Sequence, residues 1–172
     1  MRSSITTLFL CSLAAFASGC GGASGDGPRS VALGSRAPAF SLKSLDGATV
    51  TSRSLEGEVV VLNFWATWCA PCVKEIPDLK QVAANSGARV IGIALDEDGI
   101  KSVRPFAERF GINNAENYTV LLGDQDLFQR FNGFGIPYTL VLDRSQRVVQ
   151  IYRGPTTKDA LEQDLKRAVQ GA

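Results

Sequence analysis

The chain has 172 residues, which is enough for about one domain, and its 45% hydrophobic and 20% charged residues are typical of an ordinary globular protein. Its 18 basic and 17 acidic residues give a net charge of +1, which excludes nucleic-acid binding through a basic surface and disorder driven by an acidic tail. The absence of histidine excludes a Ser-His-Asp or Cys-His nucleophile, zinc sites with imidazole ligands and c-type haem attachment.

The amino-terminal segment predicts a signal peptide. Ile5–Ala17 is an uncharged stretch rich in Leu and Phe that follows a positively charged start. At about 1.5 Å per residue, a helix over this stretch would be about 20 Å long, whereas a bilayer core is about 30 Å thick. The stretch is therefore expected to be the core of a signal peptide and not a membrane-spanning helix.

Two cleavage sites compete at the end of this segment. Residues 15–17 (Ala-Phe-Ala) fit an A-x-A site, which would release a soluble periplasmic protein that starts at Ser18. Residues 17–20 (Ala-Ser-Gly-Cys) are similar to a bacterial lipobox, in which Cys20 is acylated and becomes the first residue. Acylation would also remove the odd third thiol of an exported chain. We therefore expect a lipoprotein-type signal peptide over residues 1–19 and a lipid anchor on Cys20.

The residues that follow Cys20 have the composition of a flexible tether. They are rich in Gly and Ser and lack apolar periodicity, so they contain too little hydrophobic surface to offset the entropy of ordering. We expect a tether over residues 20–35 and one folded domain over residues 36–172.

The folded domain is expected to begin with a β-hairpin and a buried central strand. Residues 40–42 and 48–51 flank Asp46-Gly47, a dipeptide that is a strong signal for a hairpin turn. Residues 59–65 form a nearly continuous run of apolar β-forming residues, which is typical of a strand buried on both faces.

Helices and strands then alternate along the chain. Apolar residues recur at helical spacing from Val73 to Ala83, and Gly87 is expected to end this helix. The remaining predicted elements are strands over 89–95, 118–122, 138–142 and 148–152, and helices over 103–110, 126–131 and 156–169. This alternation predicts an α/β fold.

The residues with the clearest chemistry are two cysteines where the central strand ends and a helix begins. Cys69 would lie at the helix N-terminus, where free N–H groups and the helix dipole stabilise an anion and lower the pKa of a thiol. Cys72 lies one turn further in and is expected to be less exposed, and Pro71 suits the first turn because it has no N–H. Such a pair provides one attacking and one resolving thiol.

Two structural interpretations of the cysteine pair are weaker. A zinc site would need a second cysteine pair or histidines, which the chain lacks. A static disulfide that closes so short a loop would add little stability, because the stabilisation grows with loop length. We therefore expect a redox-active disulfide and no metal or other cofactor.

The motifs resemble those of the thioredoxin superfamily, most closely the membrane-anchored or periplasmic thiol–disulfide oxidoreductases of the TlpA/ResA type. Asn63–Cys72 (NFWATWCAPC) and Lys74–Pro77 (KEIP) are similar to the active-site segment of that family, and Gly135–Thr139 (GIPYT) is similar to its cis-proline loop. The resemblance implies a thioredoxin-like fold, with a central mixed sheet flanked by helices, an N-terminal β-hairpin and an insertion before the cis-proline half.

The resemblance also implies roles for individual residues. Cys69 would attack a substrate disulfide and Cys72 would resolve the mixed disulfide. Pro137 would hold the partner chain in an extended form by backbone pairing, and Trp68 and Ile136 would add to substrate binding.

One acidic residue is a candidate for handling protons. Thioredoxins have a buried Asp on the strand before the motif, but this chain has Asn63 there, which cannot titrate. Glu75 lies three residues after Cys72 on nearly the same helix face, and related reductases use a Glu at this position. We favour a catalytic Glu75, because a site without histidine needs another proton acceptor. The alternative is a surface Glu75 that pairs with Lys74 or Lys80.

Two further groups of residues have weaker interpretations. The acidic run Asp96–Asp98 follows a strand, and a solvated loop explains it better than a metal site. Phe134 and Tyr138 lie beside Pro137 and could either line a substrate groove or pack in the core.

The sequence thus predicts an extracytoplasmic, lipid-anchored thiol–disulfide oxidoreductase, expected to be a monomer. It would reduce disulfides in exported proteins, for example during cytochrome c maturation, and receive electrons from a membrane thiol donor. The alternatives are a non-catalytic binding lipoprotein with a structural disulfide and a disulfide-forming oxidant. A thiol peroxidase is not favoured, because the chain lacks the Thr/Ser-rich cysteine motif of that chemistry.

Overall fold

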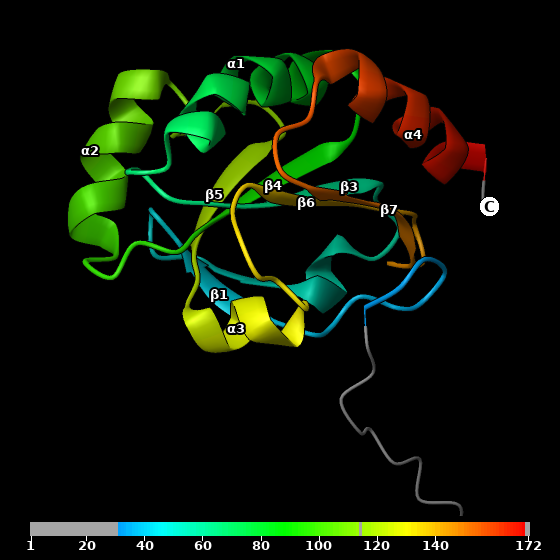
Figure 1. The fold of residues 1–172 in the computed structure, drawn as a ribbon, viewed down its shortest axis with the longest axis horizontal. Helices are drawn as coiled ribbons and strands as arrows, with labels where there is room; N and C mark the ends of the chain where they lie inside the picture. The colour runs from blue at the N-terminus through cyan, green and yellow to red at the C-terminus, as the bar shows by residue number, and fades with distance from the viewer. Residues whose placement is uncertain (1–30, 114, 171–172) are drawn as a thin grey trace, which may run out of the picture.

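A computed structural model describes residues 31–113 and 115–170, which form one mixed β-sheet with helices on both faces (Figure 1). The strands are, in chain order, β1 (Ser41–Ser44), β2 (Thr49–Thr51), β3 (Val60–Trp65), β4 (Arg89–Ala94), β5 (Tyr118–Leu122), β6 (Tyr138–Leu142) and β7 (Val148–Arg153). Their order across the sheet is β2-β1-β5-β4-β3-β6-β7. The β3–β4 and β4–β5 pairs are parallel and the other pairs are antiparallel.

The helices divide between the two faces of the sheet. They are the 3₁₀ helix η1 (Ser52–Leu55) and the α-helices α1 (Ala70–Asn85), α2 (Ile100–Phe110), α3 (Gln125–Arg130) and α4 (Lys158–Gln170). Helices α1, α2 and α4 cover one face, and α3 and η1 lie on the other (Figure 1). Among the described residues, no helix is both long and apolar enough to cross a membrane.

Strand β3 lies in the centre of the domain, and all six of its residues are buried. Because successive side chains of a strand point to opposite faces, β3 contributes to both halves of the core. Val61 and Trp65 pack under α1 and α2, and Leu62 and Phe64 pack on the α3 side. The continuous apolar run that predicted a buried strand thus serves two hydrophobic layers.

The structure confirms the predicted fold class and every predicted helix and strand, with boundaries that shift by a few residues. Helix α1 ends at Asn85, and Gly87 follows its C-cap with a positive φ of 69°, as expected for a residue just after a helix. Helix α2 ends before Gly111, which has the left-handed conformation. The short helix η1 was not predicted; the Thr51 hydroxyl caps it by accepting a hydrogen bond from the N–H of Ser54 (3.1 Å).

The segment interpreted as an insertion contributes α2 and β5. Strand β5 enters the sheet between β1 and β4, so this segment extends the sheet and does not form a separate unit. It also covers the α1 side of the core with Val103, Phe106 and Tyr118.

The predicted start of the domain at residue 36 needs a correction. Val31 is only 5% exposed and packs in the core. Gly34 donates its N–H to the carbonyl of Val148 (2.7 Å), and the N–H of Val148 donates to Ser35 (2.9 Å). Residues 31–35 therefore belong to the folded domain and not to the tether. The signal peptide, Cys20 and the rest of the predicted tether lie outside the described residues.

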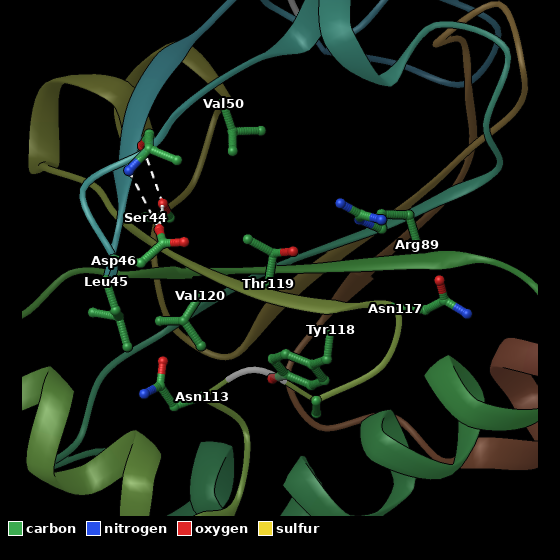
Figure 2. A pocket seen from close by; sticks show the side chains of 12 residues that line it. Ser44, Leu45, Asp46, Val50, Arg89, Asn113, Asn117, Tyr118, Thr119 and Val120 are labelled. Atoms are coloured by element: carbon green, nitrogen blue, oxygen red, sulfur yellow. Dashed lines mark hydrogen bonds between the residues drawn. The ribbon is translucent and has the colours of Figure 1, made fainter.

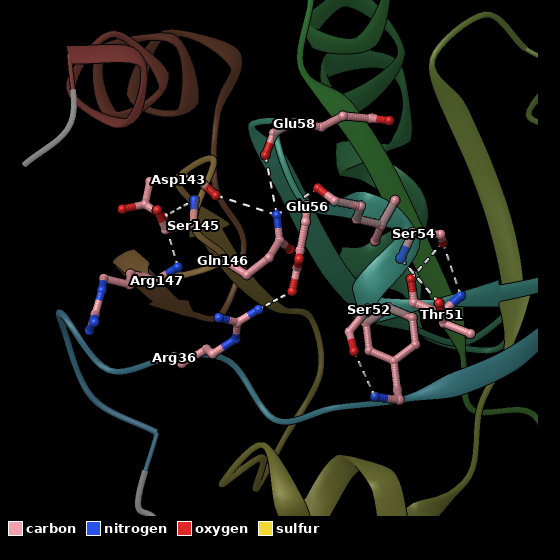
Figure 3. A network of polar contacts seen from close by, with 12 residues as sticks. Arg36, Thr51, Ser52, Ser54, Glu56, Glu58, Asp143, Ser145, Gln146 and Arg147 are labelled. Carbon is pink, nitrogen blue, oxygen red and sulfur yellow. Dashed lines mark hydrogen bonds and ion pairs between the residues drawn. The ribbon is translucent and has the colours of Figure 1, made fainter.

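Polar contacts fix this amino-terminal segment and η1 to the turn between β6 and β7 (Figure 3). Arg36 forms an ion pair with Glu56. The buried side chain of Gln146 donates hydrogen bonds to the carbonyls of Leu55 (2.8 Å) and Glu58 (3.2 Å). These contacts stabilise the end of the domain where β3 begins, whereas the cysteines follow the other end of that strand.

Candidate active site

The cysteine pair lies at the start of helix α1, a few residues after the central strand β3 ends. Cys69 is the N-cap residue of α1, and Pro71 stands in its first turn. Cys69 and Cys72 form a disulfide, with 2.03 Å between the sulfurs and 5.2 Å between the Cα atoms. The predicted strand-to-helix context of the motif is therefore confirmed.

The two sulfurs have different surroundings. Cys69 is 5% exposed and Cys72 is 1% exposed. The Sγ of Cys69 accepts a hydrogen bond from the N–H of Cys72 (3.3 Å), so the helix terminus can stabilise a thiolate at Cys69. This difference is what the predicted order of attack requires, and the order itself stays a prediction.

A buried carboxylate holds the loop that leads to the motif. Asp96, at the end of β4, accepts a hydrogen bond from the N–H of Thr67 (3.1 Å to Oδ2) and another from its hydroxyl. Asp96 is 8% exposed, so its interpretation as part of a solvated loop was wrong, whereas Glu97 and Asp98 are exposed. The carboxyl ends of the parallel strands β3 and β4 are adjacent, which brings Asp96 to Thr67.

The predicted cis-proline loop lies at the same edge of the sheet. The Ile136–Pro137 bond is cis. Tyr138 pairs with Phe64 in the antiparallel β3–β6 ladder, which places Pro137 beside the end of β3. Ile136 is half-buried and packs against the core cluster that contains both cysteines.

Two large aromatic side chains near these loops point into solvent. Trp68, directly before Cys69, is 71% exposed, and Phe134, three residues before Pro137, is 92% exposed. Phe134 therefore does not pack in the core, which was one of its two predicted interpretations. Tyr138 is buried on the other face of the sheet and donates its hydroxyl to the carbonyl of Phe131 (3.0 Å).

The side chain of Glu75 is buried on the side of α1 that faces the sheet. The alternative interpretation, an exposed surface Glu75, is therefore wrong. Glu75 is 4% exposed. Its Oε1 accepts a hydrogen bond from Nδ2 of Asn63 (2.7 Å), and its Oε2 accepts one from the N–H of Thr156 (3.2 Å). Burial raises the pKa of Glu75 to about 7, and these two hydrogen bonds oppose the rise only in part. A carboxyl group with this pKa can accept and return protons near neutral pH.

Asn63 and Thr139 support Glu75, and the sequence analysis missed this function. Nδ2 of Asn63 also donates to Oγ1 of Thr139 (2.9 Å), and both residues are at most 1% exposed. From the sequence alone, Asn63 is only a residue that cannot titrate at the position of the thioredoxin Asp. A polar residue in an otherwise apolar central strand was the available signal, because a buried amide needs partners.

Two cavities lie near the sheet but away from the sulfurs. One of about 290 Å³ lies beside the first residues of β5, beyond the part of β5 that pairs with β1, and is lined by Asp46, Arg89 and Tyr118, among others (Figure 2). Another of about 420 Å³ is lined by Thr67 and by α2 residues including Arg109. Neither contains a cysteine, and in residues 31–113 and 115–170 no group of His, Cys, Asp or Glu could hold a metal ion.

A disulfide that spans three residues at the start of a helix can exchange with thiols of another molecule. Together with the sheet and the cis-proline loop, it places the molecule among the thiol–disulfide oxidoreductases with a thioredoxin-like fold. Comparison with protein families narrows this class: the Redoxin family matches residues 32–169. The chain belongs to that family.

Individual relatives agree with this assignment. The chain is 34% identical to the thiol-disulfide oxidoreductase ResA of Geobacillus thermodenitrificans (strain NG80-2) over 142 residues, which cover 79% of this chain and 78% of the relative. It is 32% identical to the thioredoxin-like protein YneN of Bacillus subtilis (strain 168), with 77% and 78% covered. The enzyme class predicted from the motifs is therefore confirmed.

Solved structures show the same fold. A putative thiol:disulfide interchange protein DsbE from Chlorobium tepidum superposes with a TM-score of 0.72 at 30% identity, covering 81% of this chain and 99% of that one. A secreted Mycobacterium tuberculosis disulfide oxidoreductase superposes with a TM-score of 0.63 at 26% identity, covering 74% and 95%.

The raised pKa of Glu75 predicts how its replacement changes stability with pH. The native state binds the Glu75 proton more tightly than the unfolded state, so this group makes the free energy of unfolding fall as pH rises from about 4.5 to about 7. In Glu75→Gln this contribution disappears. The free energy of unfolding of the variant relative to wild type should therefore rise by up to about 3 kcal/mol across that window.

Denaturant unfolding of the oxidised proteins at a series of pH values measures this difference. Glu97→Gln is the matched control, because Glu97 is exposed, and its curve should run parallel to that of wild type. A constant difference between Glu75→Gln and wild type at all pH values would contradict the prediction.

Proposed function

We propose that the protein is an extracytoplasmic reductase of disulfides in exported proteins. The observation that carries the proposal is the pairing of a resolving cysteine, Cys72, with a buried carboxyl group, Glu75, one helical turn away, whose pKa lies near neutral pH. A disulfide with a structural role alone would not need such a group.

The proposed cycle starts from the reduced enzyme. The thiolate of Cys69 attacks one sulfur of a substrate disulfide; that bond breaks, a mixed disulfide forms, and the substrate sulfur that leaves takes up a proton. Glu75 then accepts the proton of Cys72. The Cys72 thiolate attacks the Sγ of Cys69, which releases the second substrate thiolate and leaves the Cys69–Cys72 disulfide. Glu75 then gives its proton to the released thiolate and returns to the carboxylate. A membrane thiol donor supplies two electrons and two protons to restore the dithiol.

The proposed direction rests on what surrounds Cys69. A strong oxidant needs a highly stabilised thiolate. The residues between the cysteines, Ala70 and Pro71, carry no charge, and the nearest cation in the sequence is Lys74, whose side chain is exposed. The helix terminus is left as the main stabilising feature, so the pKa of Cys69 should stay closer to that of thioredoxin than to that of a strong oxidant.

The surface around the disulfide suits an extended polypeptide. We propose that Pro137 and Ile136 pair with the substrate backbone and that Trp68 covers an apolar substrate side chain. The exposure of Trp68 supports this role, because a large apolar side chain in solvent gains by contact with a partner. Exported apocytochromes c, which contain paired cysteines, are one substrate class that the family resemblance suggests.

The proposed location rests on the signal-peptide pattern and on one relative. A similar solved structure is described as a secreted disulfide oxidoreductase. We propose that Cys20 carries the lipid that holds this chain at the membrane. Because that compartment is oxidising, a reductase there depends on the membrane donor.

Trapping tests the catalytic function. In Cys72→Ser the mixed disulfide on Cys69 cannot be resolved, so it should accumulate with exported proteins and with a synthetic disulfide peptide, as seen on non-reducing gels and by mass spectrometry. Trp68→Ala in the same background should capture several-fold less peptide. Leu33→Ala is the control, because Leu33 is 64% exposed but lies in the amino-terminal segment. If Cys72→Ser forms no adduct with either, the proposed reduction of disulfides in exported proteins through Cys69 is wrong.

The redox potential tests the direction. Equilibration of the Cys69–Cys72 pair against a glutathione series should give a potential near that of thioredoxin, about −270 mV. A value near that of the strong periplasmic oxidants, about −120 mV, would instead identify a disulfide-forming enzyme.

Mass spectrometry of the mature protein tests the anchor. The first residue should be Cys20 with attached acyl chains, and Cys20→Ser should release the protein from the membrane fraction. A mature chain that begins at Ser18 with a free Cys20 thiol would rule out the anchor while leaving the enzymatic proposal intact.

A further inference from the structure

One row of residues crosses the sheet directly under α1. Thr139 on β6, Asn63 on β3, Gly92 on β4 and Val120 on β5 are successive partners in the ladders. Thr139 and Asn63 form the polar half of this row, and Asn63 binds Glu75. Gly92 is the next position, one strand spacing of about 4.8 Å from Asn63, and because it has no side chain, the rings of Trp65 and Tyr118 can approach its backbone closely.

Two buried polar atoms converge on Gly92. A Cβ atom placed on Gly92 would lie 3.0 Å from Nε1 of Trp65 and 3.3 Å from the hydroxyl oxygen of Tyr118. Trp65 is 1% exposed and Tyr118 is 3% exposed. Neither atom has a hydrogen-bond partner among the described residues. Buried polar groups of this kind are normally satisfied, and an internal water with two to four polar partners is the common means.

The carboxylate of Glu75 can supply the remaining partner. Each of its oxygens accepts one hydrogen bond, from Asn63 and from Thr156, whereas an ionised carboxylate has about four acceptor positions. A water that accepts from the indole N–H of Trp65 and from the Tyr118 hydroxyl has both of its protons left to donate. One water can therefore accept hydrogen bonds from Trp65 and Tyr118 and donate to the free acceptor positions of Glu75.

The charged and titratable groups around Glu75 agree with this arrangement. On α1 itself, Asp78 raises the pKa of Glu75, and Cys72 lies one turn before it. Asn63, Thr139 and Thr156 face it from the sheet and the loop before α4 without carrying charge. From β5, Tyr118 is close enough that the charge of Glu75, after burial, raises the pKa of its phenol, which keeps Tyr118 a neutral donor.

We propose that the indole N–H of Trp65 and the hydroxyl of Tyr118 hold an ordered water between them, and that this water donates a hydrogen bond to the Glu75 carboxylate. Tyr118 is then a positioning residue that sets the pH at which Glu75 can accept the Cys72 proton. This inference rests on the proposed function of Glu75. Tyr118 also borders the solvent-open cavity at the edge of β5 (Figure 2), so the same side chain lies next to a source of water.

Tyr118→Phe tests the proposal. Loss of the hydroxyl weakens the water and removes a hydrogen bond from the charged form of Glu75, so the titration of Glu75 should move upward by about one pH unit. The carbon-13 signal of the Glu75 carboxyl group, followed by NMR through neutral pH, reports this shift directly. The alkaline shift should also appear in the pH–rate profile of disulfide reduction. Tyr138→Phe is the matched control, because the Tyr138 hydroxyl binds the carbonyl of Phe131 on the other face of the sheet, and it should leave the titration of Glu75 unchanged.

Two additional experiments separate the possible outcomes. Glu75→Gln should abolish the limb of the pH–rate profile near pH 7; if that limb persists, both the role of Glu75 and this proposal fail. If Glu75→Gln removes the limb while Tyr118→Phe titrates like wild type, only the water proposal fails. A crystal structure of the oxidised protein should show a water in contact with Trp65 and Tyr118, and a dry space there would overturn the proposal. Gly92→Ala should shift Glu75 in the same direction, and Tyr118→Phe carries the test if that variant does not fold.

Discussion

The burial of one carboxyl group is the constraint around which this domain is organised. An ionised carboxylate out of water is costly unless hydrogen bonds replace its hydration. Glu75 obtains them from Asn63 on β3 and from the N–H of Thr156 before α4, so elements far apart in the chain must meet under α1. Asn63 in turn needs Thr139 on β6. The same pairing of β3 with β6 places Pro137 beside the end of β3, so the hydrogen bonds of Glu75 and the position of the cis-proline loop depend on one strand register.

These hydrogen bonds offset only part of the effect of burial on the Glu75 carboxyl group, so its pKa stays raised. The proposed role of Glu75 as a proton acceptor depends on this raised pKa. Full compensation would restore an ordinary acidic pKa, and Glu75 would then be too weak a base for a thiol proton. Complete isolation would keep it protonated at all working pH values. Burial raises the pKa of Glu75, and the hydrogen bonds from Thr156 and Asn63 lower it in part, so that it lies near neutral pH. Stability at neutral pH is lower as a result, which is a common feature of catalytic sites.

Much of the fold and the central pair of the site could be predicted from the sequence, because both depend on local patterns. The apolar run of β3, the turn at Asp46-Gly47 and the Cys-x-x-Cys spacing each carry their information within a few residues. The burial of a polar residue is not encoded in its neighbours along the chain, because it depends on contacts between distant segments. Asp96 looks like part of an acidic loop until the adjacent ends of β3 and β4 bring it to Thr67. Likewise, the packing of Val31 against the core could not be expected from a Gly- and Ser-rich neighbourhood, since its contacts come from residues distant in the chain.

The two thiols are placed so that their roles cannot easily exchange. Cys69 caps α1, where the backbone N–H of Cys72 and the helix dipole favour its thiolate without any proton acceptor. Cys72 is more deeply buried than Cys69, so in the proposed cycle it needs a base before it can attack. In the proposed cycle, Glu75 on the neighbouring turn provides that base. In the proposed cycle, the thiolate at the helix N-terminus attacks first, and the deeper thiol reacts only when a carboxylate takes its proton. On this proposal, depth and helix position determine the attacking cysteine more than differences in sequence around each cysteine do.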